Sequence, residues 1–382
     1  MKRKIKVCWY CEKWQPGGIQ AVQVNLLKRM DLSTLDFHIV VSEDDTDLFN
    51  QQLSQLGVTK TVTLNKVYSS PGKRVLANIF AFKSYIKKGK FDVVHFNACH
   101  GVELVYLFWA WLYRVPIRIV HCRNNDIGAG GKSRKIKIAC HEICKVLFKN
   151  CANIKLANSD LAAIWLFGEK QYKHKQIQIL RNGIDARRYE FDKQIRDNMR
   201  NSYGLNGKFV VGHIGHFNYQ KNHEFLLHIF AEILKRNPEA VLLLVGEGER
   251  EKEIYALACK LKLEKNIIFY GVTNDVASVL CMMDVFVFPS RFEGFGNVLL
   301  EAQASGLDCF ASQDVIPKAV KVTENLHWLS LDSSYEIWAT QILSREHDHS
   351  RNNYVQKIID AGFDISNMAA HLEKIYHMPS KG

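Results

Sequence analysis

The chain has 382 residues, of which 47% are hydrophobic and 24% are charged, and this ordinary globular composition excludes an intrinsically disordered protein. One hydrophobic core seldom serves a chain of this length, so we expect two domains. The apolar stretch after the basic start is short and broken by Glu12 and Lys13, and the longest apolar run (102–113) is too short to span a bilayer, so we expect a cytoplasmic protein.

The charge is divided unevenly along the chain. Residues 1–200 contain 34 Lys and Arg against 17 Asp and Glu, a net charge of +17, whereas residues 201–382 contain 17 against 22, a net charge of −5. The excess lies in residues 51–200, with 27 basic and 10 acidic side chains. This asymmetry favours an anionic partner for the first half: a nucleic acid, an acidic polymer or the anionic cytoplasmic leaflet of a membrane.

The ten cysteines do not indicate a disulfide scaffold in a chain of this size. Cys8 and Cys11 form a Cys-x-x-Cys motif, which in other proteins binds zinc or carries redox chemistry. Cys8 lies in the strand-like run IKVCWY, however, and neither a helix start nor a second ligand pair accompanies the motif. We therefore expect two core thiols.

Strand-like runs alternate with amphipathic helical stretches along the whole chain, a pattern typical of α/β units on parallel sheets. In the first half the strands are IKVCWY, FHIVVS, VTKTVTL, FDVVHF, IRIVHC and ANIKLANS, with helices over 20–30, 74–88 and 132–150. In the second half the strands are FVVGHIG, AVLLLVGEG, NIIFYG, VFVFPS and DCFAS, with a helix over 222–236.

The alternating pattern restarts near residue 212, after a turn at Asn182-Gly183 and a polar stretch. We therefore predict two Rossmann-like domains, over 1–190 and 191–355, that face each other across a cleft. A helical tail over 356–382 is expected to pack back towards the first domain. Such a fold brings both sets of strand-end loops around one site.

Two carboxylates and a lysine in the second half suit a nucleotide diphosphate. In FPSRFEGFGNVLLEAQASG, Glu293 precedes a helix that starts near Gly296, and Glu301 follows two turns along it. The free N–H groups of a helix start suit a diphosphate, and a carboxylate suits a diol. Lys221, just before a helix that begins near Asn222, can neutralise a phosphate. The alternative is that all three are ordinary surface side chains.

Taken in order, the segments GGIQAVQVNLL, ILRNGID, HFNYQKNHEFLL, LLVGEGE and EGFGNVLLEAQASG resemble the GT-B glycosyltransferases of family 4. Within that family the similarity is to enzymes of bacterial capsule and exopolysaccharide assembly. The resemblance implies a retaining transfer from a nucleotide diphosphate sugar, most often a UDP-sugar, to a lipid-diphosphate-linked saccharide acceptor. It implies no metal and no other cofactor.

The resemblance also assigns roles. Glu293 corresponds to the residue that contacts donor-sugar hydroxyls, Glu301 to the one that binds the ribose diol, and Lys221 to the one on the diphosphate. The Gly17-Gly18 turn would let the backbone approach that diphosphate, because glycine permits close approach and unusual backbone angles. The full donor-binding set expected is Gly17, Gly18, His216, Lys221, Gly246, Glu247, Glu293, Gly294, Phe295, Gly296, Asn297 and Glu301.

One position departs from the family pattern, which has an arginine after the glycine at 215. Here that residue is His216, which is fully charged only when protonated. In the first half, His121 matches a polar histidine near the reacting sugar and joins Lys221 and Glu293 as the expected catalytic set. Three further residues are expected on the acceptor side: His95, His100 and Arg123. The alternative for a strand-end histidine is a purely structural role.

An Asp-x-Asp (Asp45, Asp47) could bind a divalent cation, but it lies far in sequence from the donor residues, so we expect a solvated acidic loop and no metal site. Helices over 73–90 and 132–149 each combine an apolar stripe, expected to face the core, with a basic rim that would attract anionic lipid. The sequence thus favours a peripheral enzyme on the inner face of the cell membrane, with no nucleic-acid partner. A nucleotide-sugar epimerase of the same fold and a non-catalytic partner subunit remain alternatives.

Overall fold

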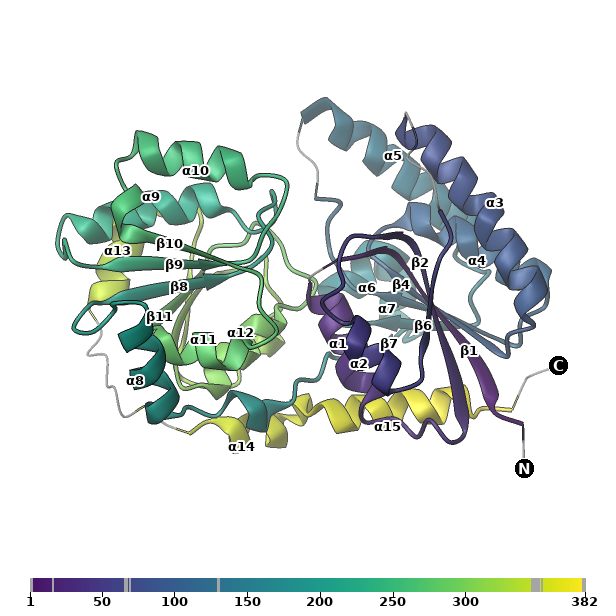
Figure 1. Ribbon diagram of the computed structural model, residues 1–382. Coiled ribbons are helices and arrows are strands. Elements are labelled where there is room, and N and C mark those ends of the chain that lie inside the picture. Colours follow the sequence, from purple (N-terminus) through teal and green to yellow (C-terminus); the bar gives the residue numbers. More distant parts are fainter. Residues whose placement is uncertain are drawn as a thin grey trace. The chain divides into compact units, whose positions relative to one another are not determined.

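The computed structural model describes residues 3–15, 17–64, 68, 70–128, 131–344, 351 and 353–379. The chain forms two compact units, which are described separately (Figure 1). Unit 1 comprises Met1–Asn182 and Ile365–Gly382, and unit 2 comprises Gly183–Asp364.

Unit 1 is built on a seven-stranded parallel sheet with the order β3-β2-β1-β4-β5-β6-β7. The strands are β1 (Ile5–Trp14), β2 (Leu35–Asp44), β3 (Thr59–Val62), β4 (Val93–Ala98), β5 (Ile117–Cys122), β6 (Ile154–Ala157) and β7 (Gln178–Ile179). The helices are α1 (Gly18–Leu27), α2 (Asn50–Gln55), α3 (Pro71–Gly89), η1 (Gly101–Glu103), α4 (Leu104–Leu112), α5 (Gly131–Phe148), α6 (Asp160–Phe167), α7 (Glu169–Lys173) and α15 (Ile365–Tyr376).

Both faces of the unit 1 sheet are buried, because alternate side chains of its strands enter two different cores. Trp9 of β1 packs on the face that carries α1 and α15, whereas Tyr10 packs with Phe82 and Tyr106 on the face that carries α3 and α4 (Figure 1). Cys8 and Cys11 point to opposite faces and are both buried, as the sequence predicted. Burial raises the pKa of Cys11 to about 12, so this thiol stays protonated.

Unit 2 is built on a six-stranded parallel sheet with the order β10-β9-β8-β11-β12-β13. The strands are β8 (Val210–Ile214), β9 (Val241–Val245), β10 (Ile267–Gly271), β11 (Val285–Phe288), β12 (Asp308–Ser312) and β13 (Leu326–Leu329). The helical segments are η2 (Ala186–Tyr189), α8 (Lys193–Ser202), α9 (His223–Leu234), α10 (Glu251–Lys260), η3 (Glu264–Asn266), α11 (Val276–Met282), α12 (Asn297–Ala304), η4 (Lys318–Val320), α13 (Tyr335–Leu343), α14 (Val355–Ile358) and η5 (Ile359–Phe363).

The unit boundaries differ from those expected from the sequence. Unit 1 ends at Asn182 rather than at 190, because Ile184 and Tyr189 pack into the core of unit 2 and Ile184 pairs with Asp364. Unit 2 runs to Asp364 rather than to 355. The final helix, α15, belongs to unit 1, where Leu372 is buried in the core.

The prediction that the apolar stripe faces the core is wrong for α5. Ile136, Ile143 and Leu147 are 68%, 58% and 64% exposed. On α3, by contrast, Phe82 and Ile86 are buried as expected. No helix within the described ranges is both long and apolar enough to cross a bilayer.

Candidate active site

An ion pair between Lys221 and Glu293 lies at the carboxyl edge of the unit 2 sheet. Lys221 is in the loop from β8 to α9, and Glu293 is in the loop from β11 to α12; because β8 and β11 are neighbouring parallel strands, the two loops leave the same edge of the sheet. Lys221 Nζ donates to Glu293 Oε1 at 2.7 Å and lies 4.4 Å from the centroid of the Phe288 ring. Glu293 is only 5% exposed.

Glycines shape the loops around this pair. Gly246, directly after β9, has a φ of +134°, and a Cβ atom there would lie 2.3 Å from the carbonyl oxygen of Gly215. The loop after β9 therefore packs backbone to backbone on the loop that carries His216 and Lys221, and the Phe217 N–H donates to the Glu247 carbonyl at 2.8 Å. The Glu247 side chain is exposed.

His216 takes the position at which the family pattern has arginine. Its side chain is partly exposed, and Nε2 lies 3.3 Å from Glu249 Oε2. Its partner in this structure is therefore a carboxylate on the neighbouring loop. A role on a diphosphate stays a prediction.

The turn before α12 brings its backbone, rather than its side chains, to the edge of the sheet. Gly296, at a φ of +90°, caps the helix, and Asn297 begins it. Phe295 is buried against Phe363, with ring centroids 5.5 Å apart, so only its backbone is available to a ligand. Gly294 is also buried.

Glu301 lies one turn from the start of α12, and its side chain has a partner that the sequence did not suggest. Its side chain hydrogen-bonds to that of Tyr189, from η2, which packs on α12. Desolvation raises the pKa of Glu301 to about 7, against the opposing effects of the Tyr189 hydroxyl and Arg188. Tyr189 was missed because it precedes the unit 2 sheet in sequence and no motif surrounds it.

In unit 1 the Gly17-Gly18 turn starts α1. Gly17 has an extended backbone, with φ −175° and ψ 168°, and Gly18 is the first helical residue. A Cβ atom on Gly18 would meet nothing within 4 Å. Neither residue has a positive φ, so this turn does not use the unusual backbone angles that glycine permits. Close approach of a diphosphate to this helix start stays a prediction.

His95 and His121 stack on neighbouring strands of unit 1, with ring centroids 5.5 Å apart. Both rings are fully buried, and His95 Nδ1 lies 3.1 Å from Trp9 Nε1 and 2.7 Å from the Tyr376 hydroxyl. Burial, followed by the positive charge of Arg123, holds both histidine pKa values well below 6.5, so both imidazoles are neutral at neutral pH. Tyr376, at the other end of the chain, had no signal in the sequence.

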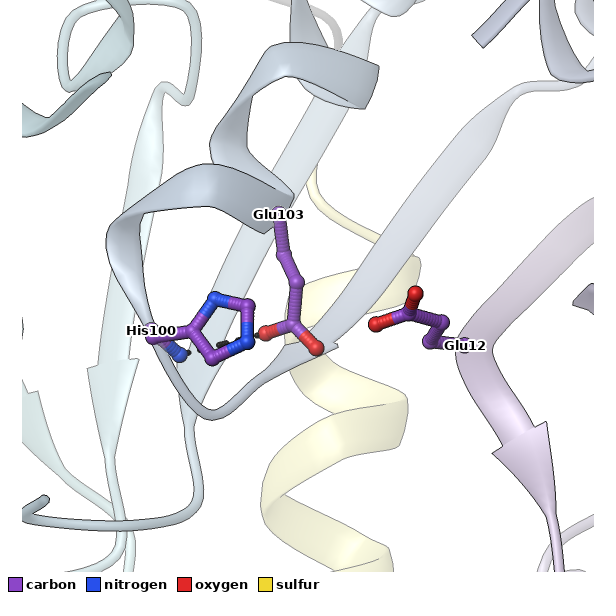
Figure 2. Close-up of side chains that lie close together, drawn as sticks. All are labelled: Glu12, His100 and Glu103. Atoms are coloured by element: carbon purple, nitrogen blue, oxygen red, sulfur yellow. Dashed lines mark hydrogen bonds between the residues drawn. The ribbon is translucent and has the colours of Figure 1, made fainter. Parts of the chain in front are cut away.

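A second polar cluster in unit 1 joins Glu12, His100 and Glu103 (Figure 2). Their ligand atoms all lie within 4.8 Å of one another, and no other such group of possible metal ligands occurs in the described part of the chain. Burial, and next the charge of Glu103, raise the pKa of Glu12. Of these three residues, the sequence predicted a role in a site only for His100. Glu12 and Glu103 lie on separate elements, so nothing in the sequence placed them together.

The Asp-x-Asp at 45–47 has other partners. Asp45 forms an ion pair with Lys13 at 2.6 Å, and Asp47 accepts a hydrogen bond from Asn50. Neither aspartate belongs to the cluster of Figure 2. The two carboxylates of the motif are thus engaged with separate groups.

Comparison with known proteins decides the family. Residues 16–188 match the family described as "Glycosyltransferase Family 4", and residues 195–361 match the family described as "Glycosyl transferases group 1". The chain belongs to the family 4 glycosyltransferases. It is a glycosyltransferase by family, and its two α/β units are the two halves of the GT-B fold.

Two relatives align with almost the whole chain. The putative glycosyltransferase EpsF of Bacillus subtilis is 26% identical over 96% of this chain and 94% of its own, and the capsular polysaccharide biosynthesis glycosyltransferase CapH of Staphylococcus aureus is 26% identical over 97% and 98%. An Escherichia coli UDP-Gal:alpha-D-GlcNAc-diphosphoundecaprenol alpha-1,3-galactosyltransferase is 24% identical over 78% and 76%. Among solved structures, Anabaena HepE in complex with UDP and glucose has a TM-score of 0.76 at 19% identity, over 98% of this chain and all of HepE.

Proposed function

We propose that the protein is a retaining glycosyltransferase that moves a sugar from a UDP-sugar to a lipid-diphosphate-linked saccharide in capsule or exopolysaccharide assembly. The observation that carries the proposal is the Lys221–Glu293 pair at the carboxyl edge of unit 2, beside the start of α12. An ammonium group and free helix N–H groups suit a diphosphate, and carboxylates suit sugar hydroxyls. The E. coli relative is named for a UDP-sugar and a diphosphoundecaprenol acceptor, and CapH for capsular polysaccharide.

In the proposed reaction, Lys221 binds the donor diphosphate through the ammonium hydrogens that are not bonded to Glu293. The bond from the anomeric carbon to the diphosphate breaks, and the acceptor hydroxyl attacks the same face of the sugar. Its proton passes to the leaving phosphate oxygen, so no protein base is needed. The protein's part is electrostatic stabilisation of the departing diphosphate by Lys221, His216 and the start of α12, together with exclusion of water. We propose that the reaction requires no metal and no other cofactor.

Two experiments test transfer itself. Incubation with a panel of UDP-sugars and an undecaprenyl-diphosphate-linked saccharide should yield an extended product with the anomeric configuration of the donor. Glu301→Ala and Lys221→Ala should abolish this product. An altered sugar formed from donor alone would favour an epimerase, and donor binding without turnover on any acceptor would favour a non-catalytic partner subunit.

The exposed surface of α5 supports a place at the membrane. Ile136, Ile143, Val146 and Leu147 are all more than half exposed at helical spacing, and Lys135 and Lys137 are exposed on the same helix. An apolar stripe with a basic rim is the pattern of a helix that lies in the lipid interface. We therefore propose a peripheral enzyme on the cytoplasmic face of the cell membrane.

Vesicle sedimentation tests this placement. Wild-type protein should sediment with vesicles that contain anionic lipid and remain free with purely zwitterionic ones, since each basic side chain near an anionic surface contributes about 1 kcal/mol. Ile143→Glu should lower the partition coefficient at least tenfold. Ile337→Glu is the matched control, because Ile337 is 49% exposed on α13 of unit 2. Equal losses in both variants, or binding that ignores lipid charge, would remove the proposal.

A further inference from the structure

Arg123 is a buried cation without a counter-ion. It follows β5 at the carboxyl edge of the unit 1 sheet and is 7% exposed. Nε donates to Asn97 Oδ1 at 2.8 Å and Nη1 to Asn182 Oδ1 at 2.7 Å, and both acceptors are neutral amides. No carboxylate of the described residues pairs with it, whereas the buried Arg196 of unit 2 pairs with Asp284 at 2.5 Å. A buried charge is costly unless it is compensated.

The groups beside Arg123 are also donors that lack acceptors. Asn97, whose carbonyl accepts from Arg123, has a buried Nδ2 without a partner among the described residues. Trp9 Nε1, which can only donate, lies 2.6 Å from the Tyr376 hydroxyl and 3.1 Å from His95 Nδ1, and that hydroxyl lies 2.7 Å from His95 Nδ1. With the hydroxyl proton directed at Nδ1, the neutral His95 carries its own proton on Nε2. That Nε2 is likewise buried and unpaired within the described structure.

Two buried nitrogens of one sheet face, Asn97 Nδ2 and His95 Nε2, therefore lack a partner among the described residues, beside the uncompensated charge of Arg123. Asn97 and His95 lie two residues apart on β4, so they share that face, and the charge of Arg123 acts on His95. Buried polar groups in folded proteins are nearly always satisfied by protein, water or ligand. A neutral ligand would leave the guanidinium charge uncompensated, but an anion would meet both needs.

We propose that Arg123 binds an oxyanion of a substrate, a phosphate or a carboxylate, with Asn97 and His95 as supporting donors. The assignment to a substrate rests on the proposed function. Two substrates of such an enzyme offer this chemistry: the diphosphate of a lipid-linked acceptor, and the carboxylate of an acidic sugar. A planar guanidinium suits either group, since both accept paired hydrogen bonds.

The test is a titration followed at the histidines next to Arg123. Full-length protein with ¹³C-labelled histidine rings is titrated at constant ionic strength with inorganic phosphate, pyrophosphate and glucuronate, and with glucose as the uncharged control. Signals of His95 and His121 are assigned from single His→Gln variants. We expect a saturable shift of the His95 signal with at least one anion and none with glucose. Anion binding in unit 2 would be recognised separately at His216.

Variants of Arg123 decide the cause of the shift. Arg123→Lys should keep the shift with about tenfold weaker binding, and Arg123→Gln should abolish it. Arg118→Gln, on the opposite end of the same strand, should leave it unchanged. A preference for pyrophosphate would assign the oxyanion to the acceptor diphosphate, and a preference for glucuronate to an acidic sugar.

Two outcomes would overturn the proposal: no saturable shift in the wild type with any anion, or a shift that survives in Arg123→Gln. If Arg123→Gln does not fold, the wild-type and Arg123→Lys titrations still decide, because an unchanged affinity in the lysine variant would exclude a role for the guanidinium. Since no donor sugar is added, a positive titration without sugar transfer would refute the proposed function alone. Transfer without any anion response would refute the Arg123 proposal alone.

Discussion

Replacing Glu301 with Gln should make the protein more stable and less active at the same time. Burial raises the pKa of Glu301 from 4.5 to about 7, so the folded state holds this proton more tightly than the unfolded chain does. Below pH 4.5 the carboxyl is protonated in both states and imposes no penalty. As the pH rises from 4.5 to 7, the wild type loses stability, and the full loss is present above pH 7.

The shift corresponds to about 3 kcal/mol at 1.36 kcal/mol per pKa unit. Because Glu301 is partly exposed, water screens its charge, and we expect about 2 kcal/mol. Glu301→Gln removes this term while its amide oxygen can still accept from Tyr189. The variant should therefore match the wild type near pH 4.5 and exceed its unfolding free energy by about 2 kcal/mol at pH 8.

Hydrogen exchange of peptides from β11 measures this difference within unit 2. Donor binding, by contrast, should become weaker. Loss of a charged acceptor for a diol costs about 2 kcal/mol, which corresponds to a roughly 30-fold higher KM for the donor. Glu232→Gln, at a partly exposed glutamate on α9 that pairs with Lys235, should change neither quantity. A Glu301→Gln variant that is no more stable at pH 8, or that keeps its donor KM, would refute the reasoning.

Four further predictions concern unit 2, the helix start at Gly18 and the metal-free scheme. Lys221→Met should lose transfer and about 3 kcal/mol of stability, because it leaves Glu293 buried and unpaired. Adding Glu293→Gln to this variant should restore the unfolding midpoint but not transfer. Gly246→Ala should cost about 3 kcal/mol in a thermal-unfolding assay, since its Cβ would lie 2.3 Å from a backbone oxygen. Gly18→Ala, whose Cβ meets nothing, should unfold like the wild type, and a slower transfer would then reflect contact with the donor. Transfer rates should be the same with and without EDTA, and a loss that Mg²⁺ or Mn²⁺ reverses would contradict the metal-free scheme.

Much of the fold could be predicted because both sheets are parallel and buried on two faces. Strands such as β9 (VLLLV) are then continuous apolar runs, which stand out against the amphipathic helices between them. The strands that were missed, β7 and β13, are short and lie at the edges of their sheets. Their sequences carry little periodicity, and their pairing depends on neighbours far along the chain.

The candidate site could be predicted only where a motif holds its residues together. Glu293 and Glu301 share one segment, but their partners in the structure, Lys221 and Tyr189, come from other elements. The exposure of the α5 stripe was also beyond the sequence, because an apolar helical stripe looks the same whether it faces a core or a lipid surface.

The Lys221–Glu293 pair makes one further prediction, since the lysine that should bind the donor diphosphate is already bonded to a carboxylate. Donor binding must therefore either share the ammonium group between two anions or exchange one for the other, and in both cases Glu293 opposes the diphosphate. Glu293→Gln removes this opposition, and we expect UDP to bind roughly ten- to 100-fold more tightly, since hydrogen bonds to charged groups contribute about 1.5–3 kcal/mol.

Sugar transfer by Glu293→Gln should fall nevertheless, because the carboxylate that accepts from the sugar hydroxyls is lost. Titration calorimetry with UDP and turnover with the UDP-sugar measure the two effects in one preparation. Glu239→Gln is the matched control, because Glu239 is exposed and precedes β9, at the opposite edge of the sheet from Lys221 and His216. Weaker UDP binding in Glu293→Gln would mean that Glu293 holds Lys221 in its binding position rather than competing for it. The pair would then be part of a preorganised diphosphate site, and donor affinity would fall with every change that loosens the β11–α12 loop.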